Sequence, residues 1–322
     1  DCKLSKGNAA RIFTGAMMPP GADAVVMQED TSSEGKEVLV KKPGPVGKNV
    51  RRAGEDIAAG TLLFKKGRRI GAADIPVIAS AGCEEVEAAA RPRVSVVSTG
   101  SELVEPGEPP GPAKVRSSNW YALCAMCAEA GALPQYHGTA RDEREVIAGK
   151  FRAAADAGDI VLSTGGVSVG DYDLVTEILE ELGSIDFWKI RIRPGKPLAY
   201  GTLCGKPFVG LPGNPIAVSA GFELFIRPML MKMMGASRIQ RPRIPARAEH
   251  DIAGRPGVTE LMRGIARFTG DGVTVRTTSR RESGILISVA DSNCYIVMNE
   301  GEGGVEKGGL VEIVPLGIDL PQ

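Results

Sequence analysis

The chain reads Asp159-Ile-Val-Leu-Ser-Thr-Gly-Gly-Val-Ser-Val-Gly170, and this stretch decides the fold class. Its first five residues include a short apolar run, which predicts a buried strand. A loop rich in glycine and hydroxyl residues follows, and from about Asp171 the apolar residues recur at helical spacing as far as Gly183. A strand, a glycine loop and a helix in this order predict one unit of a parallel sheet with crossover helices.

The same order recurs over residues 92–237, which we expect to form one doubly wound α/β domain. Asp142-Glu-Arg-Glu145 has the form of a capping box, so Asp142 is expected to begin a helix. Pro215 suits the first turn of the last long helix. Further strands are expected at residues 94–97 and 207–210, and a further helix at residues 119–130 with Ser118 as its N-cap.

The regions on either side of this domain contain short strand-like runs separated by turn residues, which predicts β structure. Residues 1–47 are expected to be a truncated β domain, with strands at residues 24–27 and 37–40, and residues 48–91 a connecting layer punctuated by glycine. Residues 238–322 are expected to form a small C-terminal β-barrel, or a sandwich. Its strands are expected at residues 265–268 and 273–276, joined by the turn Gly270-Asp-Gly272, and at residues 285–289, 294–298 and 310–314. The fold class is therefore α/β plus β.

Composition excludes several classes of protein. The 322 residues carry 39 lysines and arginines against 39 aspartates and glutamates, so no global positive field favours nucleic acid. The best candidate for a membrane span, residues 216–234, contains Glu223 and other charges and is expected to be a buried helix. The six cysteines are scattered, and Cys124 and Cys127 have a helical spacing that suits core packing. A reducing, cytoplasmic location is therefore expected.

Three loops rich in glycine and hydroxyl residues follow predicted strands. Ligands of open parallel sheets bind beyond the carboxyl ends of the strands, where glycine lets the backbone approach a phosphate. A P-loop ending in Gly-Lys-Ser/Thr and a GxGxxG dinucleotide motif are both absent from the sequence. Ordinary βα turns are the alternative for each loop taken alone. The candidate substrate-binding residues are Ser98, Thr99, Gly100, Gly165, Gly166, Ser168, Pro212, Gly213 and Asn214.

Three carboxylates, Glu102, Asp142 and Asp173, fall beside these loops. Acids near a phosphate repel it unless a hard cation lies between them, so Mg²⁺ is the expected cofactor. For Asp142 the alternative is an N-cap, and for Asp173 a charge that complements a helix dipole.

The run Arg191-Ile-Arg-Pro-Gly-Lys-Pro197 is expected to add positively charged residues beside these loops. Arginine offers a planar fork for oxyanions and lysine a point charge, so Arg193 and Lys196 are expected to bind an anion. A solvated charge run is the alternative.

Seven motifs, in order along the chain, carry a resemblance to a known family: Arg11-Ile-Phe-Thr-Gly15, Ala24-Val-Val-Met-Gln-Glu29, Arg51-Arg-Ala-Gly-Glu-Asp-Ile57, Ser98-Thr-Gly-Ser-Glu-Leu103, Ser163-Thr-Gly-Gly-Val-Ser168, Pro194-Gly-Lys-Pro197 and Leu211-Pro-Gly-Asn-Pro215. They resemble molybdopterin molybdenumtransferase of the MoeA type, which includes the E domain of gephyrin. The likeness covers essentially the whole chain, and it implies an elongated protein in which the α/β domain lies between β domains.

The resemblance implies an enzyme that inserts molybdate into the dithiolene of adenylylated molybdopterin, releasing AMP and the molybdenum cofactor with the help of a divalent cation. It implies a homodimer with a site shared between subunits, and transient contacts with other cofactor-synthesis proteins, but no nucleic-acid or membrane partner. By matching position, it implies catalytic roles for Asp56, Glu102, Asp142 and Asp173, metal binding by Glu102 and Asp173, and substrate or anion binding by Thr14, Arg193, Lys196, Arg263 and Ser288.

Two departures from the family bear on these expectations. The family has a further N-terminal segment with an Asp-Gly-Tyr-Ala motif, whose loop contributes an aspartate to the site. This chain is therefore expected to fold but to insert molybdate poorly. Arg193 stands where the family commonly has lysine, which keeps the charge but changes the geometry of oxyanion binding.

Two other functions remain open at this point. One is adenylylation of molybdopterin, because an α/β domain alone resembles both activities. The flanking β regions and residues 51–57 favour insertion instead. The other is a peptide-binding scaffold of the gephyrin kind, although the sequence has no proline-rich linker or appended module that supports it.

Overall fold

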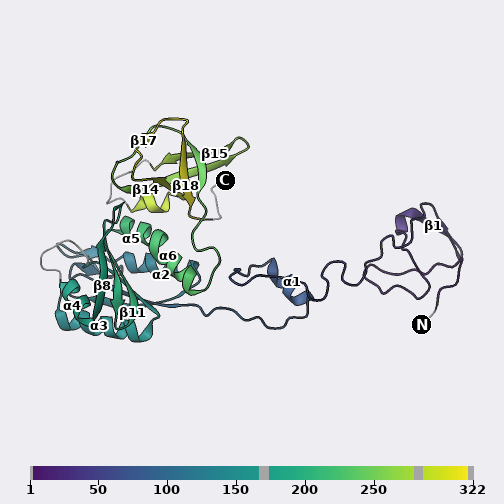
Figure 1. The fold of residues 1–322 in the computed structure, drawn as a ribbon, viewed down its shortest axis with the longest axis horizontal. Coiled ribbons are helices and arrows are strands. Elements are labelled where there is room, and N and C mark those ends of the chain that lie inside the picture. Colours follow the sequence, from purple (N-terminus) through teal and green to yellow (C-terminus); the bar gives the residue numbers. More distant parts are fainter. Residues whose placement is uncertain (1–2, 167–173, 279–285, 318–322) are drawn as a thin grey trace. The chain divides into compact units, whose positions relative to one another are not determined.

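The computed structural model describes residues 3–166, 174–278 and 286–317. The chain divides into two compact units (Figure 1). Unit 1 comprises residues 1–65 and 70–85, and unit 2 comprises residues 66–69 and 86–322. The boundaries expected from the sequence at residues 47, 91 and 237 stay predictions.

Unit 1 has little regular structure and almost no core. A short 3₁₀ helix, η1 (Gln28–Asp30), leads into a hairpin of β1 (Thr31–Glu34) and β2 (Glu37–Val40), and α1 (Asp74–Ser80) follows. The strand expected at residues 24–27 is wrong: the hairpin turns at Gly35, whose φ is +60°, so its first strand must directly precede that glycine. Among the described residues of unit 1, only Asp74 and Ile78 are buried.

Unit 2 contains the predicted α/β domain, built on one six-stranded sheet. Four neighbouring strands are parallel: β6 (Leu133–Ala140), β3 (Arg93–Thr99), β7 (Ile160–Thr164) and β11 (Lys206–Leu211). Two antiparallel strands, β10 (Pro197–Leu203) and β8 (Gly183–Lys189), extend the sheet beyond β11. These two strands were not predicted, because prolines and glycines interrupt their pattern; Gly183 and Gly201 sit where a Cβ would meet the backbone of the paired strand.

Helices cover both faces of this sheet, so the doubly wound expectation is confirmed (Figure 1). On one face α2 (Asn119–Glu129), α5 (Pro215–Gly221), the π-helical η2 (Phe222–Ile226) and α6 (Arg227–Met233) pack against side chains such as Val96 and Leu162. On the other face α3 (Arg144–Ala157) and α4 (Leu174–Leu182) pack against Val97 and Val161. Cys127 is fully buried in the first core, as its helical spacing predicted.

The C-terminal residues form the predicted closed β-barrel. Its strands are β12 (Ile244–Ala248), β14 (Thr259–Thr269), β15 (Gly272–Thr277), β16 (Cys294–Met298) and β18 (Leu310–Pro315), and β15 closes the barrel by pairing with both β12 and β14. The strand expected at residues 285–289 is wrong, because residues 287–290 form the short helix α7 (Ile287–Ala290). A closed barrel offers this connection no free strand edge to join.

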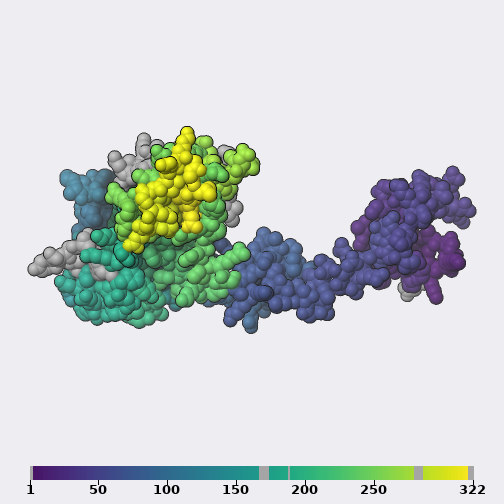
Figure 2. All heavy atoms as spheres, turned by 45° about the horizontal axis from the view of Figure 1, so that its top comes forward, coloured from purple at the N-terminus to yellow at the C-terminus, as the bar shows by residue number. Residues whose placement is uncertain are grey.

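The barrel and the α/β domain pack against each other within unit 2. The two-residue strand β9 (Ile192–Arg193), from the α/β domain, pairs in parallel with β14 of the barrel. Ala220 of α5 shares a small core with Leu261 and Tyr295 of the barrel. Figure 2 shows the barrel residues, light green to yellow, directly on those of the α/β domain. In the described part of the chain, no helix is long and apolar enough to cross a bilayer.

Candidate functional site

The three glycine loops lie at one edge of the sheet. They follow β3, β7 and β11, which are parallel neighbours, so their carboxyl ends meet at that edge. Ser98, Thr99, Gly100, Gly165, Gly166, Pro212, Gly213 and Asn214 are therefore close together, whereas Ser168 lies outside the described residues.

Glycine is required at two of these positions. Gly165 has a φ of +90°, and a Cβ there would run into the backbone oxygen of Thr99 on the neighbouring loop. Gly100 has a φ of +137°, and a Cβ there would collide with the carboxylate of Glu102. The glycines thus let two loops pass in contact and let Glu102 fold back over its own turn.

Asn119 ties the loops together, a role that sequence reasoning missed. Its Nδ2 donates hydrogen bonds to Thr164 Oγ1 and to the carbonyl oxygen of Gly213, both at 2.8 Å. In the sequence, Asn119 is an amide residue at the start of a predicted helix, and this position alone suggests only a helix cap. Asn214 Oδ1 accepts a hydrogen bond from the Ile216 N–H at 2.9 Å, so this side chain caps α5.

Buried hydroxyls line the same edge. Thr99 Oγ1 and Ser163 Oγ are buried and have no hydrogen-bond partner among the described residues. Buried polar atoms are normally satisfied, so these two hydroxyls suit a polar ligand at the loops. Burial raises the pKa of Tyr136, and its hydrogen bond with Thr139 opposes that effect.

Asp142 is held beside Glu102 by a reciprocal pair of hydrogen bonds. Asp142 Oδ2 accepts from the Ser101 N–H, and Ser101 Oγ accepts from the Asp142 N–H, both at 3.0 Å. The expected N-cap is therefore wrong: Glu143 occupies the N-cap position of α3, without a side-chain bond, because the carboxylate of Asp142 is engaged across the loops. Ser118 does hold the N-cap position of α2, but its side chain makes no capping hydrogen bond.

Asp173, Asp56 and Thr14 are not among the described residues of unit 2. Asp173 lies outside them. Asp56 and Thr14 are exposed residues of unit 1. The structure thus brings together Glu102 and Asp142, both exposed to solvent.

A pocket of about 410 Å³ opens next to this pair of acids. Gly100 and Ser101 line it together with two cations that the sequence did not suggest, Lys114 and Arg141. The Lys114 ammonium also donates a hydrogen bond to the Ser101 carbonyl. We call this space the edge pocket.

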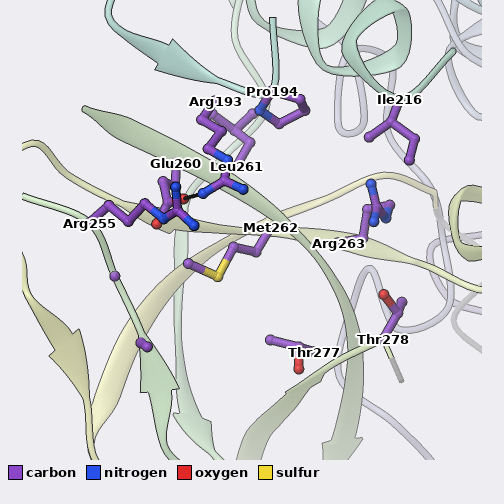
Figure 3. Close-up of a pocket in the computed structure, with 12 residues that line it drawn as sticks. Arg193, Pro194, Ile216, Arg255, Glu260, Leu261, Met262, Arg263, Thr277 and Thr278 are labelled. Atoms are coloured by element: carbon purple, nitrogen blue, oxygen red, sulfur yellow. Dashed lines mark hydrogen bonds and ion pairs between the residues drawn. The ribbon is translucent and has the colours of Figure 1, made fainter. Parts of the chain in front are cut away.

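A second pocket, of about 340 Å³, lies between the α/β domain and the barrel (Figure 3). We call it the junction pocket. Three arginines line it: Arg193 on β9, Arg263 on β14, and Arg255, which sequence reasoning missed. Thr277 and Thr278 add hydroxyl groups. The arrangement suits a tetrahedral oxyanion, because guanidinium forks and hydroxyls all donate hydrogen bonds.

The electrostatics of the junction pocket are set by burial and by one ion pair. Arg263 is buried, and this burial lowers the pKa of its guanidinium, opposed by the neighbouring Tyr295. Arg193 Nη1 donates to Glu260 Oε1 at 3.3 Å (Figure 3). Lys196 is exposed, and neither Lys196 nor the buried Ser288 of α7 is among the lining residues.

Successive parts of the chain match three protein-family models. Residues 1–82 match the MoeA N-terminal region (domain I and II), residues 95–232 a probable molybdopterin binding domain, and residues 245–316 the MoeA C-terminal region (domain IV). A molybdopterin molybdenumtransferase of Nostoc sp. is 37% identical, over 98% of this chain and 74% of its own length. One from Haemophilus influenzae is 33% identical, over 96% and 77%.

A solved structure has the same fold. The crystal structure of a molybdopterin biosynthesis MoeA protein from Pyrococcus horikoshii superposes with a TM-score of 0.79 at 33% identity, covering 98% of this chain and 77% of that one. The fold and the matches together define a molybdopterin-binding type of α/β domain set between two further MoeA regions. The chain belongs to the MoeA family of molybdopterin molybdenumtransferases.

Proposed function

We propose that this protein inserts molybdate into adenylylated molybdopterin and releases AMP and the molybdenum cofactor. The junction pocket is the observation that carries the proposal, because three arginines and two threonine hydroxyls surround a space suited to a tetrahedral oxyanion. The names of relatives that align with nearly the whole chain supply the chemical context.

In this proposal the edge pocket receives the adenylylated part of the substrate. Lys114 and Arg141 would pair with its phosphates, and the glycines of the adjoining loops would let phosphate approach the backbone. Ile216 lines the junction pocket, and Gly213, two residues before the start of α5, is tied to Asn119 at the sheet edge. Residues 213–216 therefore connect the loop at the sheet edge with the wall of the junction pocket.

Glu102 and Asp142 fit a Mg²⁺ ion by their chemistry. Both are carboxylates on loops that the Ser101 bonds hold side by side, and Mg²⁺ typically takes one or two carboxylates together with substrate phosphates. The described residues contain no group of three or more candidate ligands, so the substrate or Asp173 would have to complete the site. The ion would supply positive charge next to the phosphate.

We also propose that the protein acts as a homodimer. Unit 1 exposes large apolar side chains, including Phe13, Met17 and Leu62, and has only two buried residues among those described. A second copy of the chain would cover such a surface. Because the substrate arrives already adenylylated, transient contact with the protein that adenylylates it is part of the same proposal.

The test is one incubation with adenylylated molybdopterin, Mg²⁺ and molybdate. AMP release coupled to molybdenum uptake supports insertion. ATP consumption with unmodified molybdopterin would mean adenylylation instead. Peptide binding with neither reaction would mean a scaffold.

A further inference from the structure

Among the described residues that line the junction pocket, Glu260 is the one carboxylate, and Figure 3 shows it beside Arg193 and Arg255, with Arg263 farther away. The side chain of Glu260 is only 7% exposed, and its Oε1 accepts a hydrogen bond from Arg193. Its Oε2 is also buried, yet it has no hydrogen-bond partner in the described part of the chain. Burying a carboxylate oxygen without a hydrogen-bond partner is costly, so the pocket favours a ligand that donates a hydrogen bond to this oxygen.

The backbone fixes this carboxylate in the wall of the pocket. β9 and β14 pair in parallel with Arg193 directly opposite Glu260, so the ion pair connects cross-strand neighbours. Figure 3 marks the ion pair between the two side chains with a dashed line. With Oε1 held by Arg193, Oε2 is the oxygen that lacks a hydrogen-bond partner among the described residues.

A fully deprotonated oxyanion has no hydrogen-bond donor for the Oε2 atom of Glu260. Sulfate and molybdate are both tetrahedral dianions with four acceptor oxygens, and a carboxylate is also only an acceptor. The two groups repel each other unless one proton lies between them. The arginines alone would hold either dianion, because both have the same charge and shape.

We infer that Glu260 makes the junction pocket bind an oxyanion together with one proton, and thereby selects molybdate against sulfate. This inference rests on the proposed function. Molybdate is the stronger base of the two dianions, so it takes up the shared proton more readily. Sulfate does not take up the proton and is repelled by the negative charge of Glu260. The pocket therefore discriminates against sulfate by repulsion. A site built around a hydrogen bond rejects a ligand that cannot complete it far more strongly than an apolar pocket rejects a misfit.

The other charged and titratable groups around the pocket limit where the proton can reside. Arg193, Arg255 and Arg263 stay cationic. Burial raises the pKa of Tyr295, next to Arg263, to about 12. His250 contacts the pocket-lining Thr277: its Nε2 accepts a hydrogen bond from the Thr277 N–H at 3.2 Å and lies 3.2 Å from Thr277 Oγ1. Among the described residues, His250 is therefore the group that must be separated from Glu260 by experiment.

Calorimetry tests the inference. Molybdate and sulfate are titrated into the wild-type chain, Glu260→Gln and His250→Gln at about pH 7.5, in two buffers with different ionisation enthalpies, so that proton uptake is measured directly. We expect the wild type to take up close to one proton with molybdate and to bind sulfate at least about 100-fold more weakly. In Glu260→Gln the amide donates without a proton, so uptake disappears and sulfate affinity rises about tenfold or more. His250→Gln should keep both wild-type properties.

Four outcomes would overturn the inference. Molybdate binding by the wild type without proton uptake does so even if Glu260→Gln fails to fold. An equal loss of molybdate and sulfate affinity in Glu260→Gln would mean that Glu260 only positions Arg193. Loss of the uptake in His250→Gln would assign the proton to the histidine. Wild type that binds neither anion would instead remove the molybdate pocket from the proposed function, and the inference with it.

Discussion

The phenol of Tyr295 in the barrel shares a hydrogen bond of 2.8 Å with the hydroxyl of Ser219 on α5. Tyr295 is the cross-strand partner of Arg263, and Ser219 lies on the same helix as Ile216, which lines the junction pocket. This partly buried bond therefore joins the neighbours of two residues that line the pocket, Arg263 and Ile216. The bond fixes the arginine of one domain relative to the helix of the other.

Replacing Tyr295 by phenylalanine should loosen that arrangement while keeping the ring packed. We expect a loss of stability of about 0.5–1.5 kcal/mol, because the Ser219 hydroxyl loses its partner. Molybdate affinity should fall several-fold, as Arg263 is less well held. Calorimetry on Tyr295→Phe, Ser219→Ala and the double variant checks this: the two losses should not add, and additive losses would show that the bond does not couple the domains.

Glu102→Gln should slow AMP release by about 100-fold at limiting Mg²⁺, because removing a metal ligand or electrostatic stabiliser commonly costs that much. Raising the Mg²⁺ concentration should recover part of the rate, since a weakened site refills by mass action. The melting temperature should barely change, because Glu102 is exposed. The same behaviour is predicted from the sequence for Asp173→Asn.

The matched control for this experiment is Glu306→Gln, another exposed glutamate, located in the barrel. It should leave the Mg²⁺ dependence of AMP release unchanged. Equal rates for Glu102→Gln and the wild type at limiting Mg²⁺ would remove Glu102 from the metal site.

The cysteines should divide sharply in their reactivity. Burial raises the pKa of both Cys127 and Cys294 to about 12, so at about pH 8 these thiols are almost entirely protonated and unreactive. Cys83 and Cys204 are exposed. Iodoacetamide followed by peptide mass spectrometry should label the exposed pair in the native protein and the buried pair only after denaturation. Rapid native labelling of Cys127 would contradict the packing of α2.

The protein should sediment as a dimer at about 10–50 μM, the range in which a weak specific association is already populated. The physical reason is the uncovered apolar surface of unit 1, which includes Phe13 and Met17. Analytical ultracentrifugation measures this directly. A monomer throughout that range would leave the surface of unit 1 to some other partner.

The strongest patterns predicted the fold best. The apolar run and glycine loop around residues 159–170 identified the parallel sheet, and the Gly270-Asp-Gly272 turn identified a barrel hairpin, because local chemistry decides both. Residues 285–289 look like a strand, yet barrel closure leaves them no edge to join. Asp142 reads as a cap, yet a partner 41 residues away engages its carboxylate.

In the candidate site, too, local motifs could be predicted from the sequence, whereas contacts between distant residues could not. Motifs identified Arg193 and the three loops, because each is a local cluster of distinctive residue types. Arg255, Lys114 and Asn119 carry no such signal, since only the folded chain brings them to a pocket or between two loops. Glu260 stands out only because its pairing with Arg193 buries its second oxygen, which no spacing in the sequence reveals.

Single-turnover AMP release, measured while molybdate is titrated in, tests the central claim most directly. With adenylylated molybdopterin and Mg²⁺ present, we predict that AMP release requires molybdate and saturates with it. Arg263→Ala should raise the molybdate concentration at half-maximal rate by at least about tenfold, the loss of one hydrogen bond to a charged group. Arg267→Ala, on the same strand but exposed, should leave that concentration unchanged. AMP release at the same rate without molybdate, or an Arg263→Ala variant with the wild-type molybdate requirement, would contradict the account.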